Sequence, residues 1–393
     1  MSSHNYCVKL DKSQISGEMS TLNSLKYFLK EDRALDDEIR KEFPLSDFGD
    51  KDDTLLIKGV KELISSFNIV DQEKLDISEK LLNIEYIGLS DDSQLILMFK
   101  DDNIKAEGIY DFSYSFLDDI FQMGKFSRFC IEKGYRDLLR KNIESLIGDL
   151  GDIEKQYRLL KVNNSYKLRG ITSLRYRNYD NHLALYLALL SIHSYSKENQ
   201  KNFSLESAYM TDSEIKIFLE QIEPIKIEGF GDLYLGLYIA NNEIGDKAFS
   251  LQLRYSIVNS NGVRFSGMKG LEDAIFNLNH STGINNFKEK MKNIFTLKER
   301  QDLLISHING IKNAEKLSEN VIYLLFKKLA NSTQKLSKKT RFNAKELKNG
   351  KVIDNTMNII EIFNEVEKIT ADLDEKIYLE RIYDEVITEL YSS

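Results

Sequence analysis

Residues 231–258 read GDLYLGLYIANNEIGDKAFSLQLRYSIV and carry the clearest structural signal in the chain. Leu233 to Ile239 is a continuous apolar run. In the second half, every other residue is apolar: Phe249, Leu251, Leu253, Tyr255 and Ile257. Such alternation is typical of a strand that buries one face, and the Asn-rich stretch between the two runs has the composition of a hairpin loop. The stretch therefore predicts two antiparallel strands near residues 232–240 and 247–258.

The surrounding residues, 161–295, mix strand and helix patterns. Tyr166 to Ile171 is strand-like, whereas Leu183 to Ile192 is an apolar run long enough for a buried helix. Asp180 or Asn181 can cap that helix by accepting its free backbone N–H groups. We expect an α+β core domain over 161–295, built on an antiparallel sheet.

The first 160 residues are predicted to form a mainly helical, acidic region with a small β hairpin. Apolar residues recur at helical spacing from Leu55 to Phe67 and again from Phe112 to Leu150. Glu85 to Leu89 and Leu95 to Phe99 flank an Asp-Asp-Ser turn, which predicts the hairpin.

Residues 296–393 are predicted to be helical. Leu297 to Leu329 and Thr356 to Leu390 could each form one long helix, joined by a basic connector at 330–351. Two long helices joined in this way suggest an antiparallel hairpin. The predicted fold class is thus α+β, with a central antiparallel-sheet unit flanked by helical N-terminal and C-terminal regions.

Composition argues against a membrane-spanning, a disulfide-rich and a zinc-binding protein. The chain has 54 Lys and Arg against 62 Asp and Glu, a formal charge of −8, and 42% hydrophobic residues, which is enough for sizeable cores. No apolar run approaches the roughly 20 residues that cross a bilayer, and the N-terminus has no apolar leader, so we expect a cytoplasmic protein that does not bind membranes. Two cysteines cannot build a disulfide framework, and with five His they predict no zinc site. No cofactor and no metal are predicted.

Standard catalytic signatures are absent from the sequence. It contains no glycine-rich dinucleotide loop, no Walker phosphate loop, no HExxH and no GxSxG nucleophile motif. An enzyme is therefore disfavoured, although the sequence does not exclude one.

Charge is distributed in blocks. Residues 31–107 and 354–393 are strongly acidic, whereas 155–180 holds seven basic residues and one acidic residue, and 327–351 holds nine basic residues and one acidic residue. Charge runs are usually solvated faces, so the plain interpretation is that each basic block lies beside an acidic one.

The strongest local signal lies in residues 166–181, which read YKLRGITSLRYRNYDN. Three arginines alternate here with tyrosines, and guanidinium groups bind phosphates while aromatic rings stack on unpaired bases. The alternative is that the arginines pair with the acidic N-terminal region and the tyrosines pack at a strand-to-helix corner. With the basic connector, the candidate nucleic-acid or anion-binding residues are Arg169, Arg175, Tyr176, Arg177, Tyr179, Lys335, Lys338, Lys339 and Arg341.

A second candidate is the loop formed by Asn241, Asn242, Glu243 and Gly245. Gly245 can adopt positive φ, and Asn side chains can mimic backbone turns. We therefore expect a shaped loop that holds Glu243 in a fixed position.

Four stretches of the middle region resemble the phage/plasmid-like family known as domain of unknown function 932. They are RGITSLRYRNYDNHL at 169–183, GLYIANNEIGDKAFSL at 236–251, YSIVNSNG at 255–262 and HSTG at 280–283. The resemblance covers roughly residues 165–295. This chain has Leu174 where the family has Asp, and it lacks the family's Cys before Asn-Gly. The resemblance implies a gene carried on phages, plasmids or prophages, and it implies no reaction.

Three functions remain open. The first is a non-enzymatic phage- or plasmid-type protein that binds nucleic acid, in a single-stranded or unusual structure, through the basic and aromatic residues. The second is a protein-binding module, such as an inhibitor of a host defence factor or an assembly component. The third is a nucleotide or nucleic-acid processing enzyme with its site between the Asn241–Gly245 loop and the Arg175–Asp180 segment. The oligomeric state is not predicted.

Overall fold

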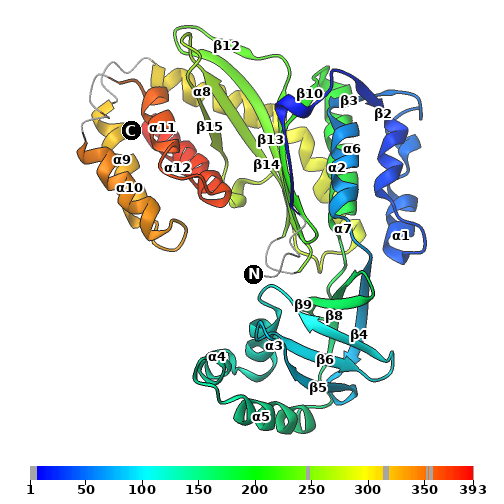
Figure 1. Cartoon of the computed structure of the whole chain (residues 1–393). Coiled ribbons are helices and arrows are strands. Elements are labelled where there is room, and N and C mark those ends of the chain that lie inside the picture. Colours follow the sequence, from blue (N-terminus) through cyan, green and yellow to red (C-terminus); the bar gives the residue numbers. More distant parts are fainter. Residues whose placement is uncertain (1–6, 245–247, 313–317, 351–352, 354–356, 393) are drawn as a thin grey trace.

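The computed structural model describes residues 7–244, 248–312, 318–350, 353 and 357–392, which form two sheets with helices packed on each (Figure 1). The fold is α+β, as predicted. Among the described residues, no helix combines the length and apolar character that crossing a membrane requires.

The larger sheet contains strands from both the start and the middle of the chain. Its strands are β1 (Cys7–Asp11), β2 (Met19–Thr21), β3 (Thr54–Lys58), β10 (Phe203–Thr211), β11 (Glu214–Gln221), β12 (Ile225–Ile227), β13 (Gly231–Asn242), β14 (Phe249–Val258), β15 (Arg264–Met268) and β16 (Phe276–Leu278). The spatial order is β15-β14-β13-β11-β10-β3-β2, with β1 beside β10, β12 beside β13 and β16 beside β14. β13 and β14 pair antiparallel, with Leu237 opposite Leu253, which confirms the predicted hairpin strands.

Helices cover both faces of this sheet. They are α1 (Ala34–Glu42), α2 (Val60–Val70), α6 (Asn181–Asn199), α7 (Ile284–Met291), α8 (Leu297–Lys312), α9 (Ser318–Asn331), α10 (Lys338–Asn349), α11 (Ile359–Glu367) and α12 (Leu373–Ser392). α6 is buried along almost its whole length and packs among the apolar side chains of the sheet. On the opposite face of β14, Arg254 is buried and pairs with Glu380 of α12.

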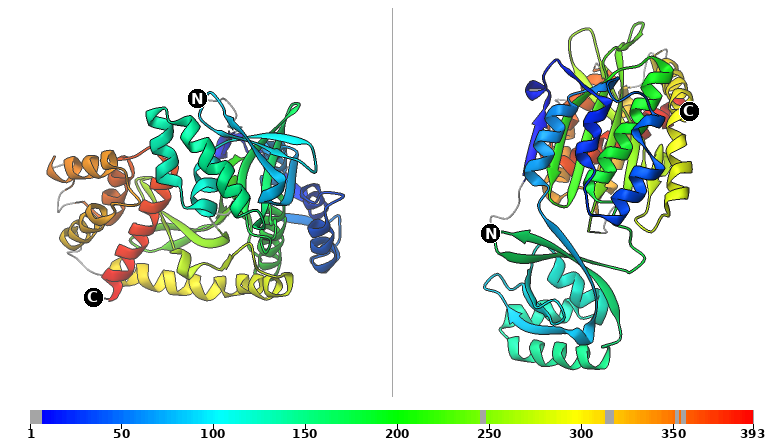
Figure 2. Two further views of the ribbon diagram at one scale, coloured as in Figure 1. Left: turned by 90° about the horizontal axis from the view of Figure 1, so that it is seen from below. Right: turned by 90° about the vertical axis from the view of Figure 1, so that its right-hand side faces the viewer.

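The second sheet is an insertion between α2 and α6. Its order is β4-β8-β9-β7-β6-β5, and the strands are β4 (Lys74–Lys80), β5 (Ile84–Leu89), β6 (Leu95–Phe99), β7 (Ile104–Gly108), β8 (Glu154–Val162) and β9 (Ser165–Thr172). Three helices pack on it: α3 (Phe112–Phe121), α4 (Gly124–Lys133) and α5 (Arg136–Asp149). We call residues 74–172 the inserted unit. The right-hand view of Figure 2 shows that it lies beyond one end of the large sheet.

The predicted domain boundaries therefore need correction. The boundary at residue 160 falls within β8, whose Tyr157 pairs with Ile171 of β9, so one hairpin was divided between two domains. The N-terminal third is also less helical than predicted, because β1, β2 and β3 join the large sheet and β4 to β8 belong to the inserted unit. The predicted hairpin of residues 85–99 is confirmed as β5 and β6.

The predicted hairpin of two long C-terminal helices is also corrected, because the described residues of this region form five shorter helices. The basic connector contains α10, whose N-cap Ser337 accepts a hydrogen bond from the Thr340 backbone N–H at 3.1 Å. Asn358 begins α11 with a capping box that includes Glu361. Ser337 therefore starts a helix where composition suggested a connector, and the predicted 356–390 helix is divided between the end of α11 at Glu367 and the start of α12 at Leu373.

Candidate functional site

Residues 241–243 and the arginine- and tyrosine-rich segment 166–181 meet where the inserted unit joins the large sheet. The Tyr176 hydroxyl donates to the backbone carbonyl of Glu243 at 3.0 Å, and the Asn181 backbone N–H donates to the Glu243 carboxylate at 2.8 Å. Asn241 donates from its side chain to the Tyr179 carbonyl at 3.0 Å. We call the charged residues gathered here the junction cluster: Lys74, Asp76, Arg158, Arg169, Asp180 and Glu243.

Glu243 lies at the centre of the junction cluster and is fully buried. Its carboxylate accepts from Lys74 of β4 at 2.7 Å and from Arg169 of β9 at 2.6 Å. Its backbone carbonyl accepts from Arg158 of β8 at 2.6 Å. One residue of the large sheet thus binds three strands of the inserted unit.

Asp180 is the second buried carboxylate. It immediately precedes α6, but it forms no side-chain capping bond to the helix. Its carboxylate accepts from Arg158 at 2.6 Å and from Arg33 at 3.0 Å instead, so the predicted capping role is wrong. Arg158 also donates to Asp76 at 2.9 Å and is therefore shared by two carboxylates and one carbonyl.

The charges of the cluster stabilise one another in their ionised forms. Burial by itself raises the pKa of Asp180, but Arg158, Lys74 and Arg169 outweigh it and hold that pKa well below its usual range. Burial and the neighbouring Asp180 raise the pKa of Glu243, and the same three cations lower it to a net value below the usual one. Burial lowers the pKa of Lys74, yet Glu243 and other carboxylates raise it overall.

The predicted loop begins later than expected, because Asn241 and Asn242 belong to β13 and pair with Ile215 and Glu214 of β11. The Asn242 side-chain oxygen accepts from the Ile244 backbone N–H at 3.0 Å, which is the local turn that Asn side chains favour. Glu243 is held in a fixed position by its three cationic partners. Gly245 lies outside the described residues.

The structure contradicts two of the candidate binding residues. Arg169 and Tyr179 are each only 1% exposed, and their polar ends bond to Glu243 and to the Thr282 carbonyl. Neither can reach a phosphate or a base from outside, because both side chains are buried. We therefore remove them from the predicted binding surface.

The other three residues of the segment are partly or fully accessible. The Tyr176 ring stacks on His280, with the ring centres 4.5 Å apart and the planes 6° apart. Arg177 is half-buried and pairs with Glu38, whereas Arg175 is exposed. The plain interpretation of the basic block holds here, since Lys161 and Lys167 also pair with Glu73 and Glu107. Acidic partners neutralise most of this block.

The basic connector differs from the 155–180 block because several of its lysines are exposed. α9, α10 and the turn between them carry seven exposed side chains that we call the basic-aromatic surface: Lys327, Lys335, Lys338, Lys339, Lys345, Tyr323 and Phe342. Tyr323 is 62% exposed and Phe342 is 60% exposed. None of the five lysines forms an ion pair with any residue that the structure describes. Arg341 is half-buried and donates to the Leu336 carbonyl at 3.3 Å.

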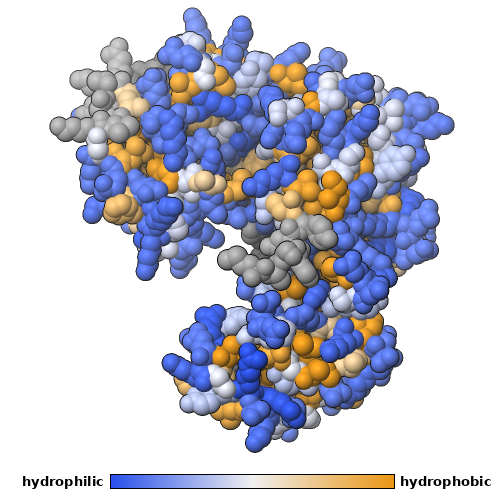
Figure 3. Space-filling view, in the orientation of Figure 1, coloured by the Kyte–Doolittle hydropathy of each residue, from blue (hydrophilic) through white to orange (hydrophobic). Residues whose placement is uncertain are grey.

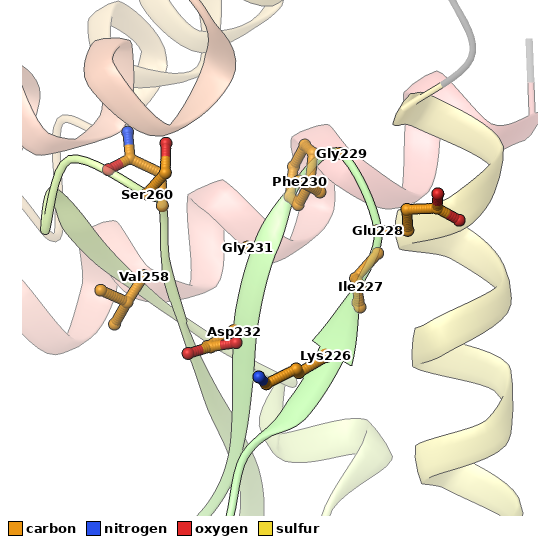
Figure 4. Close-up of a pocket in the computed structure, with 10 residues that line it drawn as sticks. Lys226, Ile227, Glu228, Gly229, Phe230, Gly231, Asp232, Val258 and Ser260 are labelled. Carbon is orange, nitrogen blue, oxygen red and sulfur yellow. The ribbon is translucent and has the colours of Figure 1, made fainter.

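The pocket at the tips of β12 to β14 and the acidic side chains are weaker candidates for a functional site. A pocket of about 560 Å³ lies between the tips of β12, β13 and β14 (Figure 4). Its charged Lys226 and Asp232 lie opposite each other in the pairing of β12 with β13, so they are placed to balance each other's charge. No group of three or more His, Cys, Asp or Glu side chains within the described ranges could hold a metal ion.

Sequence reasoning missed Lys74, Asp76 and Arg158. Lys74 and Asp76 are two residues apart and so share a face of β4, and Asp76 lies directly opposite Arg158 in the pairing with β8. These strands are separated by more than seventy residues. The three charged residues could therefore be placed together only by predicting the pairing of β4 with β8.

No protein-family model, curated protein or solved structure matches this chain. Membership of the phage/plasmid-like family stays a prediction.

Proposed function

We propose that this protein binds single-stranded nucleic acid through the basic-aromatic surface of α9 and α10. The observation that carries the proposal is the exposure of Tyr323 and Phe342 among five lysines that have no acidic partner among the described residues. Exposed rings stack on unpaired bases whatever the sequence, and lysines neutralise the phosphates.

The geometry of α10 supports this proposal. Lys338, Phe342 and Lys345 are spaced by four and three residues and therefore lie along one helix face. The opposite side of the helix is held by buried Thr340 and Ala344. The cations and the ring thus project from a fixed helix, which lowers the entropic cost of binding.

Fluorescence anisotropy with a labelled oligonucleotide tests the proposal. We expect tighter binding of a single strand than of a duplex of equal length, because only unpaired bases expose a face for stacking. Phe342→Ala should weaken single-strand binding by about 1–3 kcal/mol, the range measured for one stacked base. Phe129→Ala removes another exposed ring, from α4, and should have no effect. Equal affinity for single strand and duplex, or equal effects of the two variants, would contradict the proposal.

The proposed setting is a phage- or plasmid-type accessory protein in the cytoplasm. This part of the proposal rests on the sequence resemblance of residues 165–295 alone. It predicts that the protein copurifies with nucleic acid from a host that carries the element, and that nuclease treatment abolishes this association.

A second candidate function, docking of a partner protein, is favoured by α4 and α5. Four large apolar or aromatic side chains are exposed there: Phe126, Phe129, Tyr135 and Leu138. Clustered exposed apolar residues commonly mark protein-binding surfaces. A partner that remains bound after nuclease treatment, and is lost on Phe126→Ala with Leu138→Ala, would support this function.

A further inference from the structure

The inserted unit contains a pocket that the proposed surface does not use. It has a volume of about 320 Å³ and lies between the turn joining β5 to β6, the start of α3 and one side of α4. This volume is near the lower end of the range for small-molecule sites, which is roughly 300–1,000 Å³. Buried Leu95 and Leu117 contribute apolar walls.

One wall of the pocket is a fixed aromatic ring. Tyr114 packs directly on Gly124, where an added Cβ would lie 2.7 Å from the ring. The Arg128 guanidinium lies over the same ring, 5.0 Å from its centre. Tyr114 and Arg128 both line the pocket, so a flat ligand can extend their stack.

A second wall carries an oriented amide. Ser113 donates to the side-chain oxygen of Gln94, and the Leu95 backbone N–H donates to the Ser113 hydroxyl at 2.9 Å. Gly108 permits this arrangement, because a Cβ there would lie 2.7 Å from the Ser113 hydroxyl. With its oxygen bound to Ser113, the Gln94 amide presents N–H donors to a ligand.

The charges at the rim disfavour a phosphate in the interior. Asp111 and Glu132 are exposed lining residues, and Arg128 is the one cation among the residues that line the pocket. The rim is therefore net negative. The lining therefore favours a flat, uncharged group that accepts hydrogen bonds in its plane.

We propose that this pocket binds one unpaired nucleobase, stacked beside Tyr114 and Arg128 and hydrogen-bonded to Gln94, with its sugar and phosphate outside. This inference rests on the proposed nucleic-acid function and deepens it, because it assigns a second site where a single base is read. A base carries carbonyl and ring-nitrogen acceptors on its edge, which match the amide donors of Gln94.

Saturation-transfer NMR and calorimetric titration with adenosine, guanosine, cytidine and uridine test this inference. We expect saturable binding of at least one nucleoside and none of inorganic phosphate. Gln94→Met keeps the side-chain length but removes the amide, and Tyr114→Leu removes the ring. Each should weaken nucleoside binding tenfold or more. Tyr135→Leu, which removes an exposed ring of the same unit outside the pocket, should have no effect.

Folding of the variants is checked by thermal unfolding, and Gln94→Met provides the test if Tyr114→Leu does not fold. Absence of saturable nucleoside binding, or equal binding by wild type and Gln94→Met, overturns the inference. If that result accompanies single-strand binding that depends on Phe342, the proposed function stands and only the pocket assignment fails. If nucleosides bind but no strand does, the proposed function fails by itself.

Discussion

Glu243 accepts hydrogen bonds from three cationic side chains of the inserted unit, and each bond forms out of contact with solvent. Replacing it by glutamine keeps its shape but leaves the buried Arg169 without its carboxylate partner, whereas Lys74 keeps its ion pair with Asp71 at 3.1 Å. Breaking one side of a buried ion pair costs about 3–5 kcal/mol. We therefore expect Glu243→Gln to lower the free energy of unfolding by that amount in urea denaturation. Glu198→Gln, an exposed substitution on α6, should change it by less than about 0.5 kcal/mol.

The same cluster predicts a dependence of stability on pH. The folded-state pKa values of Asp180 and Glu243 lie below their ordinary values. Their contribution is therefore fully present above the unfolded-state pKa values of roughly 4, and it is lost as the pH falls through the lower folded-state values. The difference in unfolding free energy between wild type and Glu243→Gln should be largest near pH 7 and should shrink below about pH 4. A difference that grows in acid would contradict this account of the cluster.

Arg175 and Arg177 make a further prediction at this scale. Arg177 and its partner Glu38 are about one-third exposed, and ion pairs of this kind contribute about 0–1 kcal/mol. Arg175→Ala with Arg177→Ala should therefore lower the free energy of unfolding by no more than about 1 kcal/mol. A loss of 3 kcal/mol or more in the double variant would show that the pair is part of the buried network.

The residues of segment 166–181 show why sequence alone left its role open. Arg169 and Arg175 are chemically identical, yet one is enclosed at the junction and the other is exposed. The difference arises from Glu243, which lies more than seventy residues further along the chain. Alternating Arg and Tyr can build either a binding surface or a buried network, and only long-range contacts determine which one forms.

At the scale of the element, α10 depends on one carboxylate of α12. Glu375 accepts from the Ser337 backbone N–H at 2.6 Å and from the Thr340 and Thr370 hydroxyls at 2.5 Å each. Burial by itself raises the pKa of Glu375, but these hydrogen bonds outweigh it and lower the pKa to about 2.

Hydrogen exchange of the α10 amides measures this dependence. Glu375→Gln removes the charge that these donors stabilise, and hydrogen bonds to charged groups contribute about 1.5–3 kcal/mol. We expect the α10 amides to exchange at least tenfold faster in this variant. Glu346→Gln on the exposed side of α10 should leave exchange unchanged, and equal exchange in the two variants would contradict the assigned role of Glu375.

Elements with strong local patterns were predictable. β13 and β14 follow from alternation and apolar runs, and their hairpin needs only the residues between them. β3 was not predictable, because Leu55 and Leu56 fit the helical spacing that continues into α2, whereas both belong to a strand paired with distant partners. The basic connector was misjudged for the opposite reason, since a polar composition concealed a capped helix.

At the scale of the whole molecule, the two basic blocks differ in how many of their basic side chains pair with acidic residues. Residues 155–180 connect the inserted unit to the large sheet, and most of their basic side chains form ion pairs with acidic residues. The described part of the second block, residues 327–350, lies on α9, α10 and the adjoining turns, and these helices border a hollow between themselves and the inserted unit (Figure 3). Nucleic-acid binding is therefore expected at the second block alone. The sequence by itself had suggested that both blocks take part in binding.

The salt dependence of single-strand affinity tests this division most directly. Each phosphate contact on a single strand contributes about 0.7 to the slope of log K against log salt. Lys338→Gln, Lys339→Gln and Lys345→Gln together should flatten that slope by about 2. Arg175→Ala with Arg177→Ala should leave the slope unchanged. An unchanged slope in the lysine variant, or a flattened slope in the arginine variant, would contradict the claim that α9 and α10 carry the binding surface.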